Sequence, residues 1–387
     1  MFEKANDLDL DIVEIERPQL HNPLQRGARE LHLMDYTDHA VLMPLVRSLH
    51  AEKPFDALVC LTEPGLPTAA AVAAELGLRF TSRETVRLLR DKWAMRQLLE
   101  AHGVSPVRAA AGTAVAEIVA FLSGVACPAI LKPVDGGGSL GVVLLRSPGE
   151  AEAALARLQG LGVRAFIIEE YLTGPEISVE AFSFAGDHVI VTCTEKIVVE
   201  EAGFVELGHA LPAQLDPLTR TEVEALVRQL LDLVGYTDGP SHTELKLTPQ
   251  GPRIIEGHDR GGGGRLNELV LQTYGVDFVA TTFAWACGLM EPFSAPQARG
   301  ATAIRFFAPP AGRLRALRGL DELRTLPDVV EVDWSVAVGD MIPGARATNH
   351  GRIGHVLVRG PDTAGAVAAA ARYAERVEIV VEPELSA

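Results

Sequence analysis

The segment HTELKLTPQGPRIIEGH predicts a β-hairpin that sets two carboxylates against each other. A register centred on position 250, in its proline- and glycine-containing turn, pairs Glu244 with Glu256. The same register pairs His242 with His258 on the same face. Cross-strand partners have Cβ atoms about 5 Å apart, so two carboxylates repel unless a proton or a cation lies between them. A divalent metal would fit there, because hard cations take carboxylate oxygens, whereas a solvent-facing hairpin would need no metal.

A second segment, upstream of the hairpin, has the composition of a phosphate-binding loop. The residues PAILKP at positions 128–133 predict a buried strand ending at Lys132, and the glycine-rich run VDGGGSLG follows at 134–141. Glycines let backbone amides approach an anion closely, and the lysine adds a positive charge. The spacing matches neither GxxxxGK(S/T) nor GxGxxG, so neither common nucleotide-binding loop is present. A flexible hairpin tip is the alternative to a phosphate site.

A third segment joins two predicted strands through an acidic linker. The run FIIEEYLTGPEISVE at 166–180 contains an apolar strand, an acidic pair, a Gly-Pro break and an alternating second strand. The backbone of such a linker can contact a planar heterocycle, and the carboxylate of Glu176 can accept both hydroxyls of a ribose. The alternative is a connector between domains that carries surface acids.

In this order, the segments resemble the ATP-grasp superfamily of carboxylate–amine ligases. The resemblance covers roughly residues 85–290 and depends on four matches taken together. They are Lys92 in RDKWAMRQLLEAHGV, Lys132 with its glycine loop, the segment EEYLTGPE, and the end of the acidic hairpin, EGHDR.

The resemblance implies an ATP site built from all of these segments. Lys92 and Lys132 would hold the α- and β-phosphates, and the glycine loop would close over the β- and γ-phosphates. The acidic linker would contact the adenine, and Glu176 the ribose. The residues assigned to the nucleotide are Lys92, Lys132, Gly137, Gly138, Ser139, Glu169, Glu170, Tyr171, Leu172 and Glu176.

The resemblance also implies a metal site. Glu244, Glu256 and His258 occupy the positions that ligate two Mg²⁺ ions in the family, with Mn²⁺ as the alternative ion. The family most often has asparagine at the third position. His258 departs from that pattern, which puts its role as a ligand in question.

One further motif is similar to the L-amino acid ligases of peptide natural-product pathways. It is the stretch E-x-G-H-x-x-P that begins at Glu206, followed later by E-x-H-x-R. In that group the glutamate lies near the metal or the substrate amine, and the histidine at the position of His209 lies near the substrates. The arginine at the position of Arg260 lies near the reacting carboxylate. A loop histidine bonded by backbone is the alternative reading of His209.

The resemblance implies an ATP-dependent carbon–nitrogen ligase. A carboxylate, expected to be that of an amino acid, attacks the γ-phosphate of ATP to give an acyl phosphate and ADP, and an amine then displaces phosphate to form an amide. Two alternatives stay open. One is an ATP-grasp ligase of another pathway, of the D-alanine:D-alanine, purine or carboxylase type. The other is a non-catalytic nucleotide-binding protein of the same fold.

Composition agrees with an enzyme that acts on small molecules. The net charge of −16 disfavours nucleic acid and anionic membranes as partners. No apolar run is long enough to span a bilayer, and charged residues open the sequence, so we expect a cytoplasmic protein. Related ligases suggest a homodimer.

The expected fold is α/β (α+β), an ATP-grasp fold in three parts. Residues 1–85 would form an N-terminal doubly wound α/β domain, shortened at its start, with strands at 10–15 and 57–61. The ATP-grasp domain would cover 86–295, with a lid subdomain at about 108–172. A C-terminal α+β lobe would cover 296–387. In it we expect strands at 301–307, 330–338, 355–359 and 377–381 and a helix at 362–376.

Overall fold

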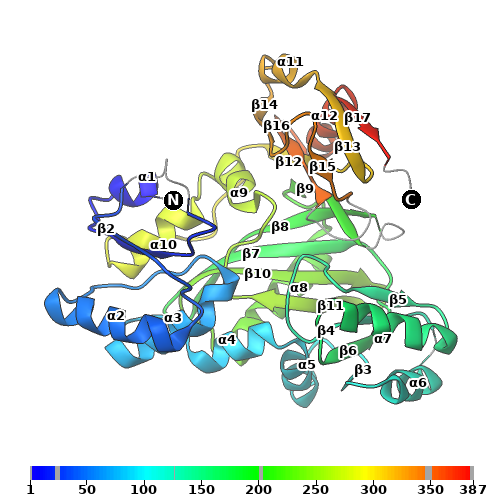
Figure 1. The fold of residues 1–387 in the computed structure, drawn as a ribbon, viewed down its shortest axis with the longest axis horizontal. Helices are drawn as coiled ribbons and strands as arrows, with labels where there is room; N and C mark the ends of the chain where they lie inside the picture. Colours follow the sequence, from blue (N-terminus) through cyan, green and yellow to red (C-terminus); the bar gives the residue numbers. More distant parts are fainter. Residues whose placement is uncertain (1, 22–26, 126, 200–203, 345–350, 384–387) are drawn as a thin grey trace.

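The structure is a computed structural model that describes residues 2–21, 27–125, 127–199, 204–344 and 351–383. Figure 1 shows an N-terminal region, a small separate sheet and a C-terminal lobe arranged around one long central sheet. In the described ranges no helix is both long enough and apolar enough to cross a bilayer.

The described part of the N-terminal region combines four α-helices and the short 3-10 helix η1 with a two-stranded parallel sheet. Helix α2 begins after Asp38, whose side chain accepts from two backbone amides of the first turn. The strand predicted at 57–61 is wrong. Leu58 packs against the apolar cluster of α2 and α3, but its backbone joins no sheet. The elements are α1 (Phe2–Asn6), β1 (Val13–Glu16), β2 (Glu30–Leu33), α2 (His39–Glu52), η1 (Glu63–Gly65), α3 (Leu66–Leu76) and α4 (Arg83–Arg90).

A four-stranded antiparallel sheet with the strand order β3-β6-β4-β5 follows helix α5 (Lys92–Ala101). Two helices cover it, and Ile118, Leu131 and Leu158 lie in the core between the layers. The strand predicted at 128–133 is confirmed as β4. The elements are β3 (Ala109–Gly112), α6 (Val115–Gly124), β4 (Ala129–Pro133), β5 (Val143–Leu145), η2 (Pro148–Glu150), α7 (Ala151–Gly160) and β6 (Phe166–Glu170).

The central sheet has eight antiparallel strands in the order β11-β10-β7-β8-β9-β12-β16-β14. Alternation along the strands separates two faces: Val179 and Leu245 pack on α5 and α8, whereas Glu180 and Glu244 belong to the opposite face. That opposite face carries the polar side chains described below. The elements from the middle of the chain are β7 (Glu176–Phe184), β8 (Asp187–Val199), β9 (Val205–Leu211), α8 (Pro217–Leu233), β10 (Gly239–Thr248), β11 (Gly251–His258), α9 (Leu266–Tyr274) and α10 (Phe278–Ala286).

The C-terminal lobe continues the central sheet, because β12 pairs directly with β9. It adds a three-stranded sheet of order β15-β13-β17, and α12 packs on β12 and β16. The predicted strands at 301–307 and 355–359 and the helix at 362–376 are confirmed, while β13 and α11 were not foreseen. The elements are β12 (Ala301–Phe307), β13 (Gly312–Arg318), α11 (Leu320–Arg324), β14 (Val329–Trp334), β15 (Met341–Ile342), β16 (Gly354–Gly360), α12 (Thr363–Glu375) and β17 (Glu378–Glu382).

Candidate active site

The β10–β11 hairpin carries the candidate metal ligands, and its register differs at the turn from the predicted one. Thr248 pairs with Gly251 around a two-residue turn, so the register is not centred on position 250. A bulge at Ile255 then shifts the pairing by one residue, and Glu244 faces Glu256. The predicted pairing of the two carboxylates is therefore confirmed, although the predicted centre of the register is wrong.

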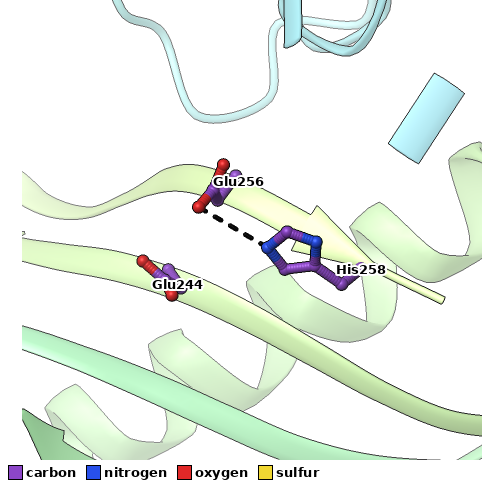
Figure 2. Close-up of side chains that lie close together, drawn as sticks. All are labelled: Glu244, Glu256 and His258. Carbon is purple, nitrogen blue, oxygen red and sulfur yellow. Dashed lines mark ion pairs between the residues drawn. The ribbon is translucent and has the colours of Figure 1, made fainter. Parts of the chain in front are cut away.

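Three side chains of this hairpin form a cluster with the composition of a cation site. Figure 2 shows Glu244, Glu256 and His258 together at one end of the hairpin. One donor atom from each lies within 4.8 Å of the other two. The His258 Nε2 is 3.5 Å from Glu256 Oε1. Two carboxylates suit Mg²⁺, and the imidazole is a ligand that Mn²⁺ also accepts.

Two lysines keep these carboxylates ionised. Lys92 Nζ lies 2.8 Å from Glu256 Oε2, and Lys196 Nζ lies 2.7 Å from Glu244 Oε2. Burial alone would raise the pKa of both carboxyls, but the neighbouring lysines and histidines hold each pKa well below its usual range. The residues present therefore fit a divalent cation, because two ionised carboxylates and an imidazole offer ligand atoms within 4.8 Å of one another.

Lys196 lies at the centre of a larger ionic cluster. Its Nζ is 2.7 Å from Glu176 Oε1, 2.9 Å from Glu206 Oε1 and 2.7 Å from Glu244 Oε2, and 2% of the side chain is exposed. Burial opposes the charge, yet the three carboxylates raise the pKa of Lys196 well above its ordinary value. The Lys196 ammonium therefore contacts three carboxylates with different predicted roles. Glu176 is predicted to bind the ribose, Glu206 to lie near the metal or the substrate amine, and Glu244 to bind the metal.

A pocket adjoins the cluster and contains every residue predicted to contact the nucleotide. Lys132, the penultimate residue of β4, lines it, and the Lys92 Nζ donates to the Gly136 carbonyl at 2.6 Å. This bond ties the glycine loop to the start of α5. The pocket is lined by Lys92, Ile130, Lys132, Pro133, Asp135, Gly136, Gly137, Gly138, Ser139, Leu140, Val142, Glu169, Glu170, Tyr171, Leu172, Glu176, Lys196, Phe204, Glu206, Glu244, Lys246, Ile255 and Glu256.

The acidic linker lies at the same pocket, but its carboxylates have protein partners. Glu169 is buried, with Lys132 Nζ 2.6 Å from its Oε2. Glu170 accepts from the backbone amide of Arg108 at 2.8 Å. Glu176 lies 3.5 Å from Lys246 Nζ in addition to its contact with Lys196. Their predicted contacts with adenine and ribose stay predictions.

Arg260, predicted to lie near the reacting carboxylate, pairs with an acid from the N-terminal region. Its Nε and NH2 donate to Glu63 Oε2 at 3.0 and 2.7 Å. The same oxygen is 3.7 Å from His258 Nδ1. Arg260 does not line the pocket but lies beyond the metal cluster, at the contact between the β11 end and η1. Glu63 therefore lies beside Arg260 and His258, although no sequence pattern predicted this position.

Glu206 and His209 lie on β9, on the side of Lys196 away from β10. The His209 Nε2 is 3.8 Å from Glu206 Oε2, and its Nδ1 is buried with no hydrogen-bond partner among the described residues. Burial lowers the pKa of His209 to about 4, so the ring is neutral near pH 7. Arg352 of the C-terminal lobe reaches Glu206 Oε2 at 3.5 Å and lies over the Phe306 ring.

Comparisons with known families match this chain in three successive stretches. The model described as ATP-grasp N-terminal domain matches residues 2–79, ATP-grasp domain matches 125–266, and L-amino acid ligase C-terminal domain 2 matches 305–382. The chain belongs to the ATP-grasp superfamily. The predicted superfamily and the predicted class of ATP-dependent carbon–nitrogen ligase are both confirmed.

Similar proteins include a carnosine synthase and two enzymes named as L-amino acid ligases. Human carnosine synthase 1 is 28% identical over 78% of this chain, which spans 39% of that longer protein. An L-arginine-specific L-amino acid ligase from Bacillus subtilis is 23% identical over 80% of this chain and 76% of its own length. The crystal structure of an L-amino acid ligase from Bacillus licheniformis superimposes with a TM-score of 0.85, 23% identity, and coverage of 98% of this chain and 95% of that one.

Several charged residues of this ATP-grasp site escaped the sequence analysis. Lys196 and Lys246 lie in strands, and the neighbouring sequence does not show that these strands are buried. Glu63 and Arg352 come from parts of the chain that are distant in sequence from their partners. For Lys196 a signal was present, since Glu195 and Lys196 interrupt the run VIVTCTEKIVV, which is otherwise free of charged residues.

Replacing Lys132 with alanine is expected to weaken ATP binding by roughly ten- to a hundredfold, since a charge-assisted contact with phosphate is lost. Calorimetric titration with ATP would measure the change. Lys53→Ala removes the same charge from an exposed position and should leave the affinity unaltered. Equal affinities for Lys132→Ala and the parent protein would refute the phosphate role of Lys132.

Proposed function

We propose that this ATP-grasp ligase joins the carboxylate of one amino acid to the amine of another and releases ADP and phosphate. One observation supports this most strongly: Lys92, Lys132, the glycine loop and the facing pair Glu244 and Glu256 meet at one pocket. In phosphoryl transfer the protein mainly positions the reactants and neutralises the charge of the phosphates, and these groups can do both.

In the proposed reaction a carboxylate oxygen of the first substrate attacks the γ-phosphorus of ATP, and the bond to the β,γ-bridging oxygen breaks to give an acyl phosphate and ADP. The amine of the second substrate attacks the acyl carbon, phosphate leaves, and the amine loses a proton. Lys92 and Lys132 would bind the phosphates, and the glycine loop would exclude water from the acyl phosphate. Nucleophilic side chains are not needed.

Glu244, Glu256 and His258 are the residues that would hold the metal. A bound Mg²⁺ or Mn²⁺ would neutralise charge on the phosphate oxygens during transfer. Two ions are proposed, with His258 as the ligand that departs from the family pattern.

The substrate end of the site is assigned to Arg260, Glu206 and His209. Arg260 offers a guanidinium for a carboxylate, and its pairing with Glu63 fixes its orientation. Glu206 offers an anion for an ammonium group, while the neutral ring of His209 stands 3.8 Å behind it. Opposite charges at the two ends suit amino acids, which carry both groups.

The test is an incubation of the purified protein with ATP, Mg²⁺ and pooled L-amino acids, with phosphate release and product masses followed together. We expect phosphate release that depends on the pool and a new mass equal to two amino acids less water. Bicarbonate and nucleotide precursors serve as the competing substrates, since purine- and carboxylase-type structures share this fold with TM-scores of 0.74 and 0.73.

Other outcomes would point elsewhere. Release with bicarbonate or nucleotide precursors alone would assign the chain to another ATP-grasp reaction. ATP binding without release on any substrate would favour a non-catalytic nucleotide-binding protein. The homodimer and the cytoplasmic location stay predictions.

A further inference from the structure

Arg96 is a buried arginine of α5 that lies behind the nucleotide pocket rather than in it. Its side chain is 2% exposed, and it does not belong to the residues that line the pocket. Isolated buried charges are costly, so such a residue needs compensating partners and a reason to stay charged. Nothing in the reaction proposed above uses it.

The contacts of Arg96 join both sheets of the ATP-grasp core. Its Nε donates to Glu169 Oε1 at 2.7 Å, and its NH2 donates to the carbonyl of Ile254 at 2.9 Å. Glu169 is the penultimate residue of β6 in the four-stranded sheet, whereas Ile254 lies in β11, two residues before Glu256. A single side chain therefore fixes Glu169 relative to the strand that carries a candidate metal ligand.

Arg96, Glu169 and Lys132 form a buried ionic cluster whose net charge depends on Arg96. Lys132 Nζ lies 2.6 Å from the second oxygen of Glu169, so the carboxylate is held between two cations. Burial alone would raise the pKa of Glu169, but Arg96 and Lys132 outweigh burial and keep it below the ordinary value. With Lys132 alone, the buried pair would have no net charge. With Arg96 present the three residues carry one net positive charge, and the pocket is lined by Lys132 and Glu169 but not by Arg96.

We propose that Arg96 is a positioning residue for the nucleotide phosphates. It neutralises Glu169, so that the charge of Lys132 remains available to an anion, and it anchors Glu169 to β11. The proposal rests on the proposed function, because it requires a nucleotide in the pocket. The competing explanation is that Arg96 only holds the two sheets together.

The test compares ADP binding by calorimetry, with and without Mg²⁺, in three variants and the parent protein. Arg96→Gln should weaken ADP binding about tenfold or more, because Lys132 becomes neutralised by Glu169. Arg96→Lys keeps the charge but cannot span both partners, so its affinity should stay within about threefold of the parent. Arg87→Gln is the matched control, since it removes one charge from the exposed face of α4.

The double variant Arg96→Gln with Glu169→Gln separates charge from structure. It again leaves Lys132 with one uncompensated positive charge, so it should bind ADP at least about threefold more tightly than Arg96→Gln, even though it also lacks the Glu169 carboxylate predicted to contact the adenine. A purely structural Arg96 would make the double variant bind no better than Arg96→Gln, and that result would overturn the proposal. So would parent-like binding by Arg96→Gln.

One further measurement separates a loss of stability from a loss of binding. Thermal melting of each variant reports the structural contribution separately from binding. If Arg96→Gln does not fold, the double variant is compared with Glu169→Gln instead: ADP affinities within about threefold of each other support the charge role, and a double variant that binds tenfold more weakly overturns it. A parent protein that fails to bind ADP at all would instead contradict the proposed function.

Discussion

Glu256→Gln is expected to lower kcat by roughly a thousandfold or more while the folded structure persists. The substitution removes one of two facing carboxylates and with it the charge that would hold a divalent cation over the phosphates. The amide keeps the size of the side chain, and Lys92 retains the Gly136 carbonyl as an acceptor. Turnover of ATP with the amino-acid pool would give kcat, and circular dichroism would report the fold.

The control for this variant is Glu378→Gln, which makes the same change at an exposed ion pair of the C-terminal lobe. Its kcat should equal that of the parent protein. A second measurement is the dependence of ADP affinity on Mg²⁺, which the parent should show and Glu256→Gln should largely lose. Turnover of Glu256→Gln within threefold of the parent would refute the metal assignment.

Lys196→Met is expected to reduce the free energy of unfolding by about 3 kcal/mol or more at neutral pH. The ammonium group compensates Glu176, Glu206 and Glu244, and breaking a buried ionic cluster from one side leaves its partners uncompensated. Methionine preserves most of the apolar stem, so the loss reports charge rather than a cavity. Denaturant unfolding measures it, with Lys53→Met as the exposed control.

The pH dependence of this variant gives an independent check. In the parent, the pKa values of Glu206 and Glu244 are depressed, so their contribution to stability is present above about pH 4.5 and is lost as the pH falls. Without Lys196, burial would raise these pKa values, and protonation would favour the folded state. The stability deficit of Lys196→Met should therefore shrink as the pH falls from about 8 to about 5. A deficit that does not change with pH would argue against uncompensated carboxylates.

The sequence predicted correctly that Glu244 faces Glu256, but it predicted the wrong turn for the hairpin. The turn of the hairpin is one residue tighter than a register centred on position 250 requires, so Glu244 would face Ile255 in a regular ladder. The bulge restores the pairing, and a one-residue slip would otherwise turn the side chains to the other face. Residue types and spacing do not reveal such a bulge.

The place of the Lys132 segment and of the acidic linker in one pocket was predictable because their signals are local. Lys132 follows an apolar strand and precedes glycines, and Glu176 follows a Gly-Pro break. The Glu63–Arg260 pair was not predictable, since 197 positions separate its members and neither stands in a periodic pattern. The prediction of a strand at 57–61 was wrong for a similar reason. An apolar run indicates burial, but a strand also needs a neighbouring strand with free hydrogen-bonding groups, and a local pattern does not show one.

The pairing of β9 with β12 has a consequence for dividing this enzyme into exchangeable parts. A cut before β12 would remove the partner of Gly208–Leu211 and leave a bare strand edge in the middle of the sheet, next to Glu206 and His209. Such edges recruit other chains and aggregate. The last ninety or so positions are thus poor candidates for transplantation between relatives. A chimaera joined before β12 would need a β12 whose hydrogen-bonding register matches that of β9.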